Sequence, residues 1–78
     1  MPFRIDDNVV TIDGHSLVEE AQPLFEALLG VDEPIFDLGQ AQTLHTAVVQ
    51  LVLASTGRVL KAPPDRWLAA CFRDRIVA

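Results

Sequence analysis

Residues 35–57 of the chain have the sequence IFDLGQAQTLHTAVVQLVLASTG. It opens with a short apolar run ending at Asp37, which predicts a buried strand. A polar turn over residues 39–42 follows, and then a dense apolar segment, which predicts a helix over residues 43–56 with Thr43 as its N-cap. A strand, a loop and a helix with a hydroxyl group in its first turn are therefore the expected centre of the fold.

The segment before this stretch predicts a β-hairpin. Residues 3–12 contain two strand-like pieces around an Asp-Asp-Asn trio at 6–8, whose side chains favour turns. We expect Val10 and Ile12 to face one side of the second strand and Val9 and Thr11 the other, with one of the two sides buried, and residues 13–14 to end the strand.

A first helix is predicted after the hairpin. Ser16 followed by Glu19 has the spacing of a capping box, in which both side chains satisfy free amides of the first turn. The helix is expected to bend at Pro23 and to end at Gly30. Its apolar stripe comprises Leu17, Ala21, Leu24, Phe25 and Leu28.

The segment after residue 57 predicts a strand and a third helix. Residues 58–62 are strand-like, and Asp65 is the expected N-cap of the helix, with Arg73 and Arg75 placed favourably near its end. The apolar positions of this helix are Trp67, Leu68, Cys71 and Phe72.

Composition limits the function classes. The 78 residues allow one domain, spanning 1–78, and the net charge of −5 disfavours nucleic acid and anionic lipid, so a protein partner is expected. The single cysteine, Cys71, excludes an internal disulfide and fits a reducing cytoplasm. The N-terminus lacks a signal-peptide core, and the richest apolar run, 47–54, falls short of the ~20 residues that span a bilayer.

Four side chains that can carry chemistry have simpler interpretations. His15 and His45 lack ligands at metal-binding spacing and are expected to be surface or capping residues. Cys71 is expected to be a small buried residue, and Trp67 an anchor in the core or at its edge. No metal site or cofactor is predicted.

The order of strands, helix, strand, helix, strand and helix predicts an α/β fold, with an N-terminal hairpin and a mixed sheet packed against helices. From residue 9 to 72 this layout resembles the STAS family, which includes anti-sigma factor antagonists, sulphate-transporter tails and a subunit of a bacterial lipid-transport ABC complex. The resemblance rests on the Asp-Gly at 13–14, IFDL at 35–38, LHTAV at 44–48 and LKAPP at 60–64.

The resemblance implies a bacterial, cytoplasmic, non-enzymatic interaction module and places the family's phosphorylatable hydroxyl group on Thr46. His45 stands where the family usually has Asp, and Val48 where it usually has Gly. These departures favour constitutive docking over phosphorylation. The implied partner is an anti-sigma factor kinase or the ATPase subunit of a transporter, and the chain stops where the family would add a last strand and helix.

Docking is expected on the face of the second helix opposite its core side. A phosphate on Thr46 would meet free backbone amides and would place about two negative charges beside Val49 and Leu53, opposing an apolar partner. The predicted partner-binding residues are Gln42, Thr43, His45, Thr46, Val49, Gln50 and Leu53.

Three alternatives remain open from the residues alone. Thr46 can be an ordinary hydroxyl residue of the capping region. Asp37 and His45 can form an acid/base pair in a small enzyme or ligand-binding domain. Val49 and Leu53 can form the interface of a homodimer.

Overall fold

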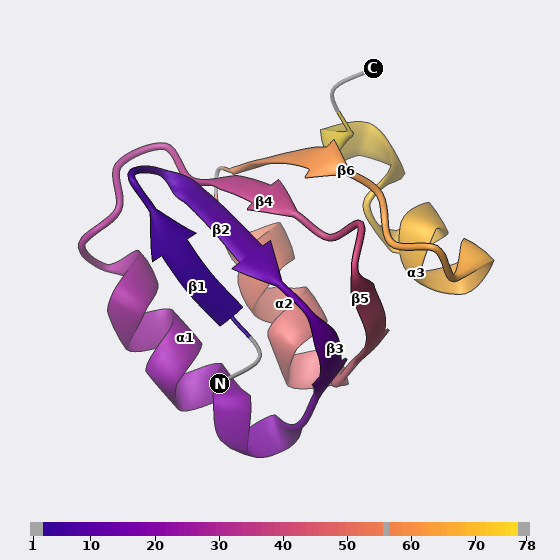
Figure 1. Ribbon diagram of the computed structural model, residues 1–78, viewed down its shortest axis with the longest axis horizontal. Helices are drawn as coiled ribbons and strands as arrows, with labels where there is room; N and C mark the ends of the chain where they lie inside the picture. The colour runs from indigo at the N-terminus through magenta and orange to yellow at the C-terminus, as the bar shows by residue number, and fades with distance from the viewer. Residues whose placement is uncertain (1–2, 56, 77–78) are drawn as a thin grey trace.

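The computed structural model describes residues 3–55 and 57–76, and it places a β-sheet in one layer with α1 and α2 against one of its faces (Figure 1). The α/β class with a mixed sheet is confirmed. In chain order the elements are β1 (Phe3–Asp6), β2 (Val9–Ile12), β3 (Gly14–Ser16), the 3-10 turn η1 (Val18–Glu20), α1 (Ala21–Leu28), β4 (Ile35–Asp37), β5 (Ala41–Leu44), α2 (Thr46–Ala54), β6 (Arg58–Lys61), α3 (Arg66–Cys71) and the 3-10 turn η2 (Arg73–Arg75).

The main sheet has the strand order β1-β2-β4-β6. The expected hairpin is confirmed, since β1 pairs antiparallel with β2, and its turn holds Asp7 at a φ of 57°, a conformation that Asp tolerates. β4 runs parallel to both β2 and β6, so it is the central strand between two crossovers.

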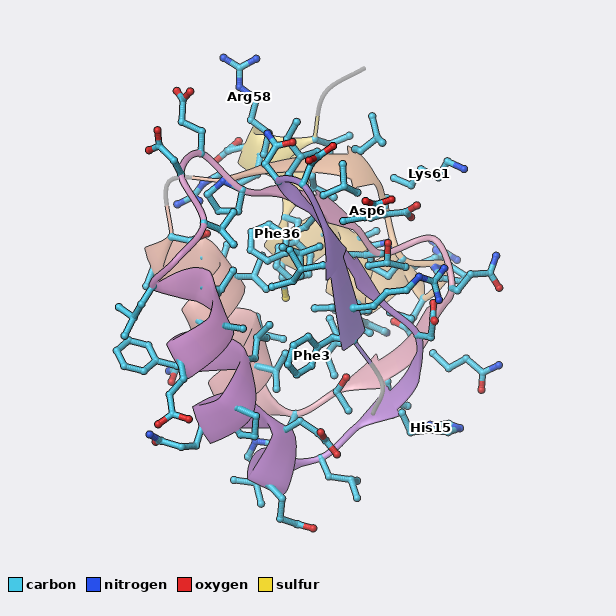
Figure 2. The ribbon with its side chains drawn as sticks, turned by 60° about the vertical axis from the view of Figure 1, so that its left-hand side comes forward. Phe3, Asp6, His15, Phe36, Arg58 and Lys61 are labelled. Carbon is cyan, nitrogen blue, oxygen red and sulfur yellow. The ribbon has the colours of Figure 1, made fainter. Side chains whose placement is uncertain are left out.

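One row of side chains crosses this sheet at its buried face. Val10 pairs with Phe36, and Phe36 pairs with Val59. All three are 0% exposed, because alternate residues of each strand point to the same face. Figure 2 shows Phe36 in the interior of the molecule, whereas Arg58 and Lys61 extend from its outside.

A second sheet, β3 paired in parallel with β5, was not expected. The amide of Gly14 donates to the carbonyl oxygen of Gln40 at 2.9 Å, and the amide of His45 donates to that of Ser16 at 3.0 Å. The second strand of the hairpin does end before residues 13–14, as predicted. The prediction that 39–42 form only a turn is wrong, because Ala41 and Gln42 belong to β5. These two strands form by backbone pairing between segments that are distant in sequence. Neither has the alternation of apolar residues from which a strand is predicted.

The start of the first helix also differs from the prediction. Ser16 lies in β3, is 3% exposed, and within the described residues its hydroxyl group makes no hydrogen bond, so the capping box is not formed. Leu17 precedes η1 instead, and α1 begins only at Ala21. Pro23 thus falls in the first turn of α1, where its missing N–H costs no intrahelical bond.

The third helix is short and buries little of its own surface. The carboxylate of Asp65 accepts the amides of Trp67 at 2.8 Å and Leu68 at 3.2 Å, which confirms the predicted N-cap. Trp67, however, is 84% exposed and Cys71 is exposed, so both expectations of burial are wrong. α3 has only six residues, fewer than two full turns. The residue that enters the core is Phe72, directly after the helix, which is 0% exposed.

Candidate functional site

The candidate site begins where β5 passes into α2. His45 has extended backbone angles, and its Nδ1 atom accepts the amide of Ala47 at 3.0 Å, so His45 rather than Thr43 is the N-cap of the helix. Thr46 follows as the first helical residue and is exposed. The expectation of a capping histidine is confirmed at this position.

Thr43 has a different role from the one predicted. It lies in β5, where its hydroxyl oxygen is 2.8 Å from Nδ1 of His15 on the paired strand β3. His15 is exposed, as expected, and Figure 2 shows it at the end of the molecule away from Arg58 and Lys61. The cross-strand contact fixes the segment that leads into α2.

Five of the predicted partner-binding residues are polar and exposed, and we call them together the α2 entry surface. Four of them come from the end of β5 and the start of α2, and the fifth lies one turn further along the helix on the same side as Thr46. Its members are Gln42, Thr43, His45, Thr46 and Gln50, all exposed.

The other two predicted residues, Val49 and Leu53, are not exposed. Val49 is 8% exposed and belongs to the core, and Leu53 is half-buried against it. Val48 and Val52 are buried as well, at 1% each, so the buried arc of α2 is wider than helical spacing indicated. The prediction that Val49 and Leu53 present an apolar outer face is therefore wrong, and the homodimer interface built on them loses its basis.

Exposed apolar surface lies instead in an open groove between α1 and α2. Two adjoining hollows, of about 380 and 220 Å³, share Phe25, Leu51 and Ala54. We call this feature the α1/α2 groove. Its apolar walls are Ala21, Phe25 and Leu28 from α1, and Ala47, Leu51 and Ala54 from α2.

The wall supplied by α1 is the more exposed one. Phe25 is 45% exposed, and Leu29, directly after the helix, is 72% exposed. The sequence placed Phe25 in the buried stripe of α1, but only Leu24 of that helix is buried. The sequence contained an indication of this exposed surface. α1 has more apolar residues than the side of a helix that packs on a sheet can bury, so some of them had to remain exposed.

The predicted pair of Asp37 and His45 is not joined by a hydrogen bond in the described ranges. One carboxylate oxygen of Asp37 accepts the amide of Gly39 at 3.1 Å, which is a local turn contact. His45 uses Nδ1 for the helix cap. Each group thus has a structural partner within two residues of itself.

The described residues contain neither a cluster of metal ligands nor a helix that could span a membrane. No group of three or more His, Cys, Asp or Glu side chains is arranged to hold a metal ion in these ranges. Among the helices of the same residues, none has the length and apolar content to cross a bilayer.

Comparisons with known proteins give no assignment. No family model matches the chain, and no curated protein or solved structure is significantly similar to it.

Proposed function

We propose that this chain is a non-enzymatic protein-interaction module of the STAS type, which docks a protein partner through the α2 entry surface and the adjoining α1/α2 groove. The observation that carries the proposal is the position of the groove. Ala47 and Gln50 line it together with residues of α1, and Gln50 also belongs to the entry surface. The apolar groove and the polar entry surface therefore adjoin each other, like the apolar centre and the polar rim of protein interfaces generally.

The arrangement of elements supports the STAS-type part of the proposal. An N-terminal hairpin leads into a mixed sheet with a central parallel strand, and helices alternate with the strands. The segment with the strongest sequence resemblance, 44–48, starts α2 and forms part of the entry surface. A bacterial, cytoplasmic module that binds an anti-sigma factor kinase or a transporter ATPase is the function that this resemblance favours.

Docking is proposed to be constitutive rather than controlled by phosphorylation. Thr46 is exposed, and a phosphate there would lie near the positive end of the α2 dipole. The amide of Ala47, however, already donates to His45, so one of the donors that a phosphate would use is occupied. Incubation with ATP and candidate kinases should leave Thr46 unmodified by mass spectrometry, and substantial phosphate on it would reverse this part of the proposal.

The test of docking is an affinity capture from the native cell with four folded proteins. Thr46→Glu and Gln50→Arg change exposed residues of the entry surface, while Thr11→Glu makes a matched change on the strand face away from the helices. We expect one partner to co-purify with wild type and Thr11→Glu and to disappear with the other two. Partners that persist in all four would contradict the proposed surface, and the partner's sequence would decide between kinase and transporter ATPase.

A further inference from the structure

The α1/α2 groove has the dimensions and walls of a site for a helix. α1 has eight residues and α2 nine, so the groove is roughly 12–14 Å long, or somewhat more than two helical turns. Both walls are helices, whose backbone donors and acceptors bond within the helix, so no strand can be added here. An amphipathic helix needs only side-chain contacts along such a groove.

The charges around the groove all have one sign on the α1 side. Glu19 and Glu20 lie in η1 directly before α1, and Glu26 lies on α1 itself. α2 contributes no charged residue, and the chain has no Lys or Arg between Arg4 and Arg58.

One cation lies near the far end of the groove. The guanidinium group of Arg75 reaches the C-terminal end of α2, where it donates to the carbonyl oxygens of Leu53 and Ser55. Its hydrogen-bonding groups are directed at the backbone of α2, and it lies at the opposite end of the groove from Glu19 and Glu20. The groove is therefore an apolar channel, and carboxylates lie next to its α1 wall, where Nε2 of the lining residue Gln22 donates to Glu26 at 3.4 Å.

From this complementarity we infer that the groove receives an amphipathic helix of the partner protein whose polar flanks carry Lys and Arg. The inference rests on the proposed docking function and adds the chemistry of the bound segment. Apolar side chains of that helix would cover Phe25 and Leu51, and its cations would lie beside Glu19 and Glu26. Electrostatic complementarity of this kind speeds association and excludes partners with acidic flanks.

A second copy of this chain fits the groove less well. Its basic helix is α3, which has only six residues and is therefore shorter than the groove. Its exposed side chains include Arg66 and Trp67, so self-association through α3 is a defined competing outcome.

The test is selection from a displayed library of helical peptides of about 18 residues, with apolar residues fixed at helical spacing and all other positions randomised. The binding constants of the selected peptides are then measured against wild type and variants. Phe25→Asp changes the groove wall, and Trp67→Asp is the matched control, an exposed aromatic residue on α3. Circular dichroism first confirms that each variant is folded.

We expect the selected peptides to be enriched in Lys and Arg. Phe25→Asp should weaken their binding by about ten-fold or more, and Trp67→Asp by no more than about two-fold. The double variant Glu19→Lys, Glu26→Lys should weaken binding of the basic peptide by about ten-fold and strengthen binding of a peptide whose cations are replaced by Glu. About 0.5 M salt should reduce both charge effects.

Selection of neutral or acidic peptides, or greater sensitivity to Trp67→Asp than to Phe25→Asp, would overturn the inference. Sedimentation showing a dimer that Phe25→Asp dissociates would also overturn it, since a second copy would then fill the groove. If the native partner is lost with Thr46→Glu and Gln50→Arg while the selected peptides are not basic, the proposed function stands and the inference alone fails. A native partner that persists in those variants contradicts the proposed function itself.

Discussion

The Nη2 atom of Arg75 lies 2.6 Å from the carbonyl oxygen of Leu53, and this contact joins the C-terminal segment of the chain to the end of α2. Nη1 of the same side chain donates to the carbonyl oxygen of Ser55 at 2.9 Å. The last carbonyl groups of a helix have no hydrogen-bond partner within it and form the negative end of its dipole. A guanidinium group at this end therefore stabilises the helix both by donating hydrogen bonds and by its positive charge. The sequence placed Arg75 at the end of the third helix, but it serves the second.

Removal of this contact should lower stability. We expect Arg75→Ala to reduce the free energy of unfolding by about 1–3 kcal/mol, because it removes two charge-assisted hydrogen bonds from half-buried carbonyl groups. Arg75→Lys should recover only part of the loss, since an ammonium group lacks the planar fork that reaches both oxygens. Urea unfolding followed by circular dichroism measures both, and the exposed neighbour Arg73→Ala should change the value by less than about 0.5 kcal/mol. Equal losses at positions 73 and 75 would contradict this role.

Gly57 should be intolerant of any side chain. A Cβ atom at this position would lie 2.5 Å from the carbonyl oxygen of Pro34 and 2.6 Å from Cε2 of Phe36, closer than real contacts allow. We expect Gly57→Ala to cost about 1–3 kcal/mol, as overpacking of a core does. Gly30→Ala is the control, because its Cβ would meet only the carbonyl oxygen of Ala27 at 3.9 Å, and it should be neutral or stabilising by up to about 1 kcal/mol. Thermal unfolding of the two variants should therefore shift in different directions or by clearly different amounts.

The cap of α2 can be improved. Nδ1 of His45 accepts the amide of Ala47, and an aspartate oxygen would make the same bond while adding a negative charge at the positive end of the helix. We expect His45→Asp to raise the free energy of unfolding by about 0.5 kcal/mol and His45→Ala to lower it by about 0.5–1 kcal/mol. His15→Asp, on β3, should not raise the free energy of unfolding. A similar increase at both positions would show that net charge, and not capping, is its cause.

The two sides of α2 should respond differently to truncation. Val49 is 8% exposed, so Val49→Ala should cost roughly 1.5–3 kcal/mol through lost burial and the cavity left behind. The adjacent Gln50 is exposed, and Gln50→Ala should change stability by less than about 0.5 kcal/mol. Denaturant midpoints of the two variants test this, and a Val49→Ala protein as stable as wild type would contradict the burial of that side chain.

The predictable parts of the fold were those with strong local signals. Alternating residues and a turn trio predicted the hairpin with one buried face, and the structure shows that this face is the one carrying Val10 and Ile12. The apolar run before Asp37 predicted β4, and the strand predicted over residues 58–62 is β6, which spans Arg58–Lys61. Asp65 was recognised as a cap because its partners lie two and three residues away. The hairpin and the Asp65 cap form through interactions that are close in sequence, whereas β4 and β6 were predictable from the apolar composition of the strands themselves.

The parts that could not be predicted depend on distant partners. Ser16 has the spacing of a capping residue, yet its backbone pairs with β5, some 28 residues further along, and this pairing prevails. The exposure of Phe25 and the burial of Val49 depend on which sides of α1 and α2 are covered, and a helical wheel contains no such information. The end of the predicted second helix at Thr56 lies outside the described residues, and the helix as described spans Thr46–Ala54.

The parallel pairing of β4 on both sides has a kinetic consequence. Phe36 at its centre is paired with Val10 and Val59, each more than twenty residues away along the chain. Neither pairing can form until a long loop has closed, whereas the hairpin of β1 and β2 closes across two residues. The hairpin is thus the part of the sheet that can form early, and the rate of folding is set by the arrival of β4 and β6 beside it, as is usual when non-local contacts dominate.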